Sequence, residues 1–86
     1  MNNIYKEIIN HYGETNQKRM LQEDCGELIQ AISKDLRGKD HNVEEEIADL
    51  IIMLNQMMII YDKNSINDWI EYKLKVIKYK MKEGVN

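Results

Sequence analysis

Apolar residues recur along this chain at the three- and four-residue spacing that places them on one face of an α-helix. Four such stretches follow one another, separated by short polar segments that contain glycine, asparagine or aspartate. The predicted helices span residues 4–12, 15–36, 42–61 and 65–81. The pattern therefore predicts an all-α protein, a four-helix bundle formed by one domain over residues 1–86.

Polar residues at the predicted helix ends have the types that cap helices. Thr15 is a candidate N-cap of the second helix, and Asn42 with Glu45 three residues later forms the sequence pattern of a capping box for the third. Ser65 with Asp68 is expected to open the fourth helix after a turn. The glycines expected at or beyond helix C-termini are Gly13, Gly38 and Gly84.

The third helix is almost entirely apolar after Asp49, and a helix of that kind is normally buried on most sides. A chain of 86 residues has a marginal core of its own and cannot easily cover such a helix. We therefore expect a homo-oligomer, a dimer or a tetramer, in which association through the third helix completes the bundle. The apolar residues concerned are Leu50, Ile51, Leu54, Met57, Met58, Ile59 and Ile60.

Composition narrows the class of protein further. The chain has no proline or phenylalanine, and its single cysteine, Cys25, cannot form an internal disulfide, which fits a reducing cytosol. The N-terminus lacks the basic and apolar regions of a signal peptide, and no apolar run is long enough to span a membrane. We expect a cytoplasmic protein without a membrane partner. The net charge of −3 argues against general binding to nucleic acid.

Two pairs of carboxylates are the strongest chemical feature of the sequence. Asp24 and Glu27 lie three residues apart on the second helix, and Glu46 and Asp49 repeat this spacing on the third. Residues at this spacing share one face of a helix, and both pairs fall within or beside the apolar stripe. Antiparallel neighbouring helices would bring the four carboxylates together. Such a cluster is a candidate site for a hard divalent cation with oxygen ligands, above all Mg²⁺.

A structural interpretation of these acids is also open. Charged runs on helices are usually solvated, so the acids could lie in water at one end of the bundle. They could also pair with Lys18, Arg19 or Lys34. A protein with such acids need not be an enzyme, and a non-catalytic helical bundle that acts as an interaction or regulatory module is the alternative function. An interaction helix has no reason, however, to hold four acids on inward faces.

The acidic pairs resemble a known family motif. Asp24-x-x-Glu27, eighteen residues and then Glu46-x-x-Asp49 is similar to the paired motif of the all-α NTP pyrophosphatases, which include MazG-like proteins and the dimeric dUTPases and dCTPases. Segments 27–32 and 45–54 resemble the surroundings of the two motifs in small MazG-like proteins. The likeness extends roughly over residues 12–81. The chain departs from the family pattern at Asp24, where glutamate is usual, although Glu23 stands next to it.

The resemblance implies hydrolysis of a nucleoside triphosphate to the monophosphate and pyrophosphate. It implies that Asp24, Glu27, Glu46 and Asp49 are ligands of Mg²⁺, with Mn²⁺ as a substitute, and leaves open whether Glu23 or Asp24 is the first ligand. A spare acid, Glu23 or Glu45, would orient or deprotonate the attacking water. Glu45 has a competing structural role in the capping box.

Two further residues are candidates for substrate binding. Gln17 has support from the resemblance as a contact to the nucleotide. Lys73 falls within the apolar stripe of the fourth helix, where it either extends its ammonium group past the apolar surface to water or binds phosphate. The remaining residues of note are expected to be structural, with Trp69 in the core and Cys25 packed on the second helix.

Overall fold

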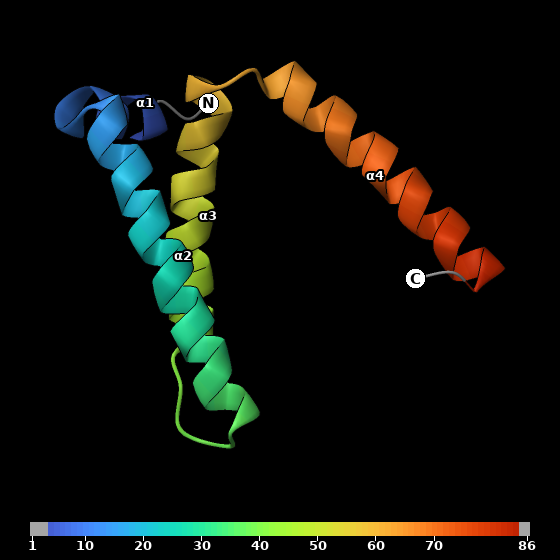
Figure 1. The fold of residues 1–86 in the computed structure, drawn as a ribbon. Coiled ribbons are helices and arrows are strands. Elements are labelled where there is room, and N and C mark those ends of the chain that lie inside the picture. The colour runs from blue at the N-terminus through green and yellow to red at the C-terminus, as the bar shows by residue number, and fades with distance from the viewer. Residues whose placement is uncertain (1–3, 85–86) are drawn as a thin grey trace.

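The computed structural model describes residues 4–84 and confirms the all-α prediction. Figure 1 shows the four helices in chain order. Their bounds are α1 (Ile4–Tyr12), α2 (Glu14–Leu36), α3 (Val43–Ile60) and α4 (Lys63–Glu83). The predicted number and order of helices are therefore correct, and the differences lie at the helix ends and in the packing.

The first junction is tighter than the sequence pattern predicts. α2 begins at Glu14 with Gly13 at its N-cap position, so the prediction of Thr15 as N-cap is wrong. The Gly13 N–H donates to the Ile9 carbonyl at 2.7 Å, and the Gly13 carbonyl accepts from the Gln17 N–H at 3.1 Å. One residue thus ends α1 and starts α2, and its φ of 92° is readily adopted by glycine alone.

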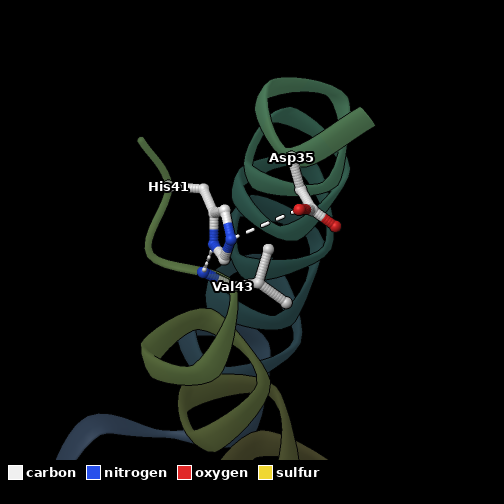
Figure 2. A network of polar contacts seen from close by, with 3 residues as sticks. All are labelled: Asp35, His41 and Val43. Atoms are coloured by element: carbon white, nitrogen blue, oxygen red, sulfur yellow. Dashed lines mark hydrogen bonds and ion pairs between the residues drawn. The ribbon is translucent and has the colours of Figure 1, made fainter. Parts of the chain in front are cut away.

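The connection between α2 and α3 contains the predicted left-handed glycine, Gly38, with a φ of 72°. The capping box predicted for α3 does not form, because the Asn42 side chain accepts no bond from the helix backbone. Instead, the Val43 N–H donates to Nδ1 of His41 at 3.2 Å, while Nε2 of His41 lies 3.3 Å from a carboxylate oxygen of Asp35 (Figure 2). His41 therefore links the end of α2 to the start of α3.

The connection between α3 and α4 is short and extended. Asp62 caps α4 by accepting from the Ser65 N–H at 3.1 Å, so α4 begins at Lys63 and the prediction that Ser65 opens it is wrong. Tyr61 (φ −101°, ψ 175°) and Asp62 (φ −73°, ψ 103°) both have non-helical backbone. Neither has the left-handed conformation that reverses the chain at Gly38.

The packing centres on α2 and α3, which lie side by side, with α1 against both at one end (Figure 1). The fourth helix runs away from this group, and among the helices described it contacts α3 alone. The radius of gyration, 16.2 Å, exceeds the value of about 12 Å expected for a compact domain of this length. The buried apolar residues are Ile9, Ala31, Met53 and Met57.

The apolar third helix is less covered than its sequence predicts. Its buried line includes Met53 and Met57, but Ile51 and Leu54 on an adjacent face are 51% and 46% exposed. Trp69, expected in the core, is 56% exposed on α4, and Cys25 is exposed rather than packed on α2. Both expectations are wrong for a single chain, and for Trp69 the reason is that, among the described helices, α4 contacts α3 alone.

The described helices also bear on membrane insertion. None of those in residues 4–84 combines the length and the apolar character that crossing a bilayer requires.

Candidate functional site

The four carboxylates of the two acidic pairs lie on the facing helices α2 and α3. Asp24 and Glu46 are each 8% exposed, whereas Glu27 is exposed and Asp49 is partly buried. One member of each pair thus points between the helices, and the other lies at the edge of the contact. The sequence prediction that both pairs lie within or beside the inward stripe is confirmed.

Electrostatics show that the acids of one pair influence one another. The pKa of Glu27 is raised above its ordinary value of 4.5, first by loss of solvation and then by a hydrogen bond with Asp24 and by the charge of Asp24. The charges of Asp49 and Glu23 raise the pKa of Glu27 further. The contribution of Asp49 comes from α3, so it acts across the two helices.

The pKa of Glu46 shows the same influence between the two acidic pairs, from the side of α3. Burial is the first cause that raises the pKa of Glu46, followed by the charges of Glu27 and Asp49, a hydrogen bond with Asp49 and the charge of Glu45. The second cause is the charge of a carboxylate on the opposite helix, and such repulsion grows as the distance between carboxylates falls. The structure therefore brings the two acidic pairs into one negatively charged group.

The basic side chains that the sequence offered as partners of this acidic group lie elsewhere in the structure. In the described part of the chain, none of the four acids forms an ion pair with Lys18, Arg19 or Lys34. Lys18 instead places its ammonium group 4.7 Å from the centre of the Tyr61 ring. The structural interpretation in which these basic residues hold the acids is thus not supported.

A neutral side chain, Asn42, contacts the acidic group from the N-terminal end of α3. The Asn42 amide donates to Glu46 at 3.3 Å and to Glu45 at 3.4 Å, so it orients both side chains. Within residues 4–84, no three His, Cys, Asp or Glu side chains are already arranged to hold a metal ion. The donor set is nevertheless made of carboxylate oxygens, which suit Mg²⁺ chemically.

Two buried glutamines lie on the same helix faces as the buried acids, one on α2 and one on α3. Gln17, predicted to bind substrate, is 5% exposed on the same face of α2 as Asp24. Gln56, which the sequence interpretation missed, is 0% exposed on α3, and its Oε1 has no hydrogen-bond partner. The spacing of Glu46, Asp49, Met53 and Gln56 is helical and could have revealed it.

Replacement of Gln56 by Met should stabilise the protein. Methionine has nearly the same length and removes the unpaired buried oxygen, whose burial costs about 1–3 kcal/mol. We expect a higher midpoint of thermal unfolding, measured by circular dichroism. Asn55→Met is the control, because the Asn55 amide donates to the Ile51 carbonyl at 3.0 Å and to the Tyr5 hydroxyl at 3.4 Å. A lower midpoint for Gln56→Met than for the wild type would contradict the prediction.

Lys73 lies apart from the acids of its own chain. It occupies the middle of α4, with its ammonium group 5.7 Å from the centre of the Trp69 ring. Since α4 makes no contact with α2 in the described chain, the structure does not bring Lys73 and the acidic pair of α2 together within one chain. Any role of Lys73 at these acids therefore requires a different placement of α4, or a second chain.

Stability without divalent cations should increase on mild acidification. The raised pKa values of Glu27 and Glu46 mean that the folded protein binds protons more tightly than the unfolded chain. Their stabilising contribution is fully present below the unfolded value of 4.5 and is lost as pH rises through the raised values. We expect thermal midpoints in EDTA to rise from about pH 7 to pH 5 more in the wild type than in a Glu27→Gln/Glu46→Gln variant. Equal slopes would contradict this expectation.

Comparison with protein families shows which family the chain resembles. Residues 13–81 match the family model described as the MazG nucleotide pyrophosphohydrolase domain, and this range includes both acidic pairs. Comparison with curated proteins and with solved structures gives no match.

Proposed function

Since the chain belongs to the MazG nucleotide pyrophosphohydrolase family, we propose that it hydrolyses a nucleoside triphosphate to the monophosphate and pyrophosphate. The observation that supports this most directly is the burial of carboxylates on both facing helices, with Asp24 on α2 and Glu46 on α3 each 8% exposed, and burial followed by the charge of Glu27 raises the pKa of Glu46. Folding holds like charges together there, and no described basic residue forms an ion pair with them, which costs stability unless a cation binds. Family membership does not favour the alternative of a non-catalytic helical module.

Asp24, Glu27, Glu46 and Asp49 would hold Mg²⁺, or Mn²⁺ in its place. When bound, the cation balances the negative charge of the phosphates and lowers the pKa of a water molecule. The arrangement of the acids supports this assignment: two are buried and aligned, and two lie at the solvent edge where phosphate oxygens can approach. An acidic protein needs such a bridge to bind a triphosphate.

An acid next to the proposed ligands would orient and deprotonate the attacking water. Glu23 and Glu45 are both exposed, and the charge of each raises the pKa of a neighbouring acid of the group. Glu45 accepts from the Asn42 amide, which orients its carboxylate, but it takes no part in a capping box, because that box does not form. We assign one of the two as the group that orients the water and accepts its proton.

We also propose that the protein acts as a homo-oligomer. Each of α2 and α3 has a second apolar face that is not used in the contact between the two helices. Helical spacing places these two faces on the same side of the α2–α3 pair. Two copies that place these faces together about a two-fold axis would bury them. The exposed apolar residues of this face are Ile29, Ile32, Leu36, Ile47, Ile51 and Leu54.

A substrate panel tests the reaction. Purified protein with Mg²⁺ is incubated with the common and oxidised NTPs and dNTPs, and the products are separated by ion-exchange chromatography. Monophosphate and pyrophosphate in equal amounts are expected from at least one substrate. Release of single phosphate, or no turnover of any substrate, would contradict the proposal.

Lys73→Met should weaken catalysis without weakening the fold. Methionine keeps the length of the side chain in the apolar stripe and removes the charge that we propose to bind phosphate. A lost charge-assisted contact is worth about 1.5–3 kcal/mol, so kcat/KM should fall by about tenfold or more. Lys75→Met, on the opposite face of α4, is the matched control. Unchanged kinetics in a folded Lys73→Met protein would remove Lys73 from the site.

A further inference from the structure

Asn42 is the last residue before α3, and it contacts Glu46 twice. Its carbonyl accepts the Glu46 N–H at 3.1 Å, which is a backbone hydrogen bond of the first helical turn. Its side-chain amide donates to Oε2 of Glu46 at 3.3 Å and to Oε1 of Glu45 at 3.4 Å. Asn42 therefore holds both the main chain and the side chain of Glu46, one of the four carboxylates that we propose to bind a cation.

The amide contacts of Asn42 are not helix capping. In a capping interaction the side-chain oxygen of Asn42 would accept a backbone N–H of α3, and it accepts none. The donor end of the amide is used instead, and it serves two carboxylates. The preference of asparagine for helix N-termini therefore does not account for these contacts, which indicate a role at the acids themselves.

Glu46 is suited to a hydrogen-bond donor that carries no charge. Its side chain is 8% exposed, and a buried carboxylate is unfavourable unless hydrogen bonds or an opposite charge replace the lost water. A basic residue would replace that water by neutralising the carboxylate, and the attraction for a cation would fall with it. An amide donates without changing the net charge. Carboxylates that bind metal ions are commonly hydrogen-bonded in this way by residues outside the ligand set.

One imidazole ring fixes the chain on both sides of Asn42. Nδ1 of His41 accepts the Val43 N–H at 3.2 Å, so the ring reaches past Asn42 to the first residue of α3. Nε2 of the same ring lies 3.3 Å from Asp35 at the end of α2 (Figure 2). Because Nδ1 accepts a hydrogen bond, the proton of the ring is on Nε2 and is directed to Asp35. The Asn42 backbone (φ −127°, ψ 43°) thus lies in a short turn that is tied to both helices.

We propose that Asn42 is a positioning residue of the cation site, which holds the carboxylates of Glu46 and Glu45 in place, and that His41 keeps Asn42 in the orientation that this requires. The inference rests on the proposed function, since it treats Glu46 as a ligand. It adds to the two acidic pairs a residue that acts through a ligand rather than as one.

Binding of Mn²⁺ in the absence of nucleotide tests this role. Asn42→Ser is the informative variant, because serine is as good an N-cap residue as asparagine but is too short to reach the Glu46 carboxylate. Electron paramagnetic resonance measures free Mn²⁺ at a temperature well below unfolding. The dissociation constant should rise by about tenfold, the lower end of the range for residues that orient metal ligands. The thermal midpoint in EDTA should stay the same or rise.

Asn16→Ser is the matched control for this measurement. The Asn16 amide donates to the Tyr12 carbonyl at 2.8 Å on the exposed surface, so the same substitution there should leave Mn²⁺ binding unchanged. Equal affinities for wild type and Asn42→Ser, or an equal loss in Asn16→Ser, would overturn the role of Asn42 and leave the proposed function standing. A wild-type protein that binds no Mn²⁺ would refute the proposed cation site, and the role of Asn42 with it.

Rescue by excess cation separates positioning from a merely structural role. Because the expected loss is one of cation affinity, hydrolysis by Asn42→Ser should be slow at low Mg²⁺ and approach the wild-type rate as Mg²⁺ is raised. A defect in the folding of α3 would instead lower the rate at every concentration of Mg²⁺. A rate reduced by the same factor throughout the titration would therefore overturn the proposal.

A double-mutant cycle tests the part assigned to His41. His41→Phe keeps a ring at this position and removes both nitrogen contacts, so it should weaken Mn²⁺ binding in the wild-type background. In the Asn42→Ser background it should add little, because both substitutions act on the same carboxylates. Additive losses of Mn²⁺ affinity would overturn the inference that His41 acts through Asn42.

Discussion

Glu46→Ala is expected to lower the rate of triphosphate hydrolysis by at least about a hundredfold while the helices stay folded, because the loss of a cation ligand removes charge stabilisation from the reaction. Glu46 is buried between α2 and α3, and its pKa is raised by its burial and by the charges of Glu27 and Asp49. Removing its carboxylate relieves repulsion in the metal-free protein. The thermal midpoint in EDTA should therefore stay the same or rise.

The same variant should lose its response to Mg²⁺. In the wild type, a cation that binds the folded state raises the thermal midpoint by mass action. Glu44→Ala is the matched control, since Glu44 is an exposed acid in the first turn of the same helix. Full activity in Glu46→Ala, or an equal loss in Glu44→Ala, would show that the acids of the two pairs do not form the site.

Ile51→Glu is expected to dissociate the oligomer and to lower stability by about 2 kcal/mol or more, the range of a central interface residue. Ile51 is 51% exposed in a single chain, in the middle of the apolar face that we propose to pair across the two-fold axis. A buried carboxylate without a partner is strongly unfavourable there.

Light scattering after size-exclusion chromatography at micromolar concentration measures the mass of wild type and variant. Gln30→Glu adds the same charge at an exposed position of α2 away from this face, and it should leave the mass unchanged. A wild-type protein with the mass of one chain would refute the oligomer, and an Ile51→Glu protein with the wild-type mass would move the interface elsewhere.

The sequence predicted the parts of the fold that depend on local periodicity. The four helices, the reversal at Gly38 and the inward positions of Asp24 and Glu46 follow from spacing along a single helix, and the structure confirms them. The acids were found because carboxylates in an apolar stripe are conspicuous. Gln56 lies on the same helical line but is uncharged within an apolar run, so its burial does not stand out in the sequence.

Periodicity did not predict which hydrogen bonds form at a helix end or which surface covers an apolar face. Asn42 is at the predicted cap position, but its amide donates to the Glu45 and Glu46 side chains, and its side chain accepts no bond from the helix backbone. Trp69 was expected in a core because periodicity shows that a face is apolar, not which chain covers it. The roles of Glu23, Glu45, Gln17 and Lys73 stay predictions, because they depend on substrate.

The separation of α4 from the other helices has a consequence for how the protein folds. Contacts between α2 and α3 join segments linked by a short turn, so this pair can form rapidly within one chain. Within one chain the fourth helix contacts α3 alone among the described helices, so if a second copy of the proposed oligomer covers it, its final ordering is a bimolecular step. Refolding should then show a slow phase whose rate rises with protein concentration, and dilution should expose α4 to proteases first.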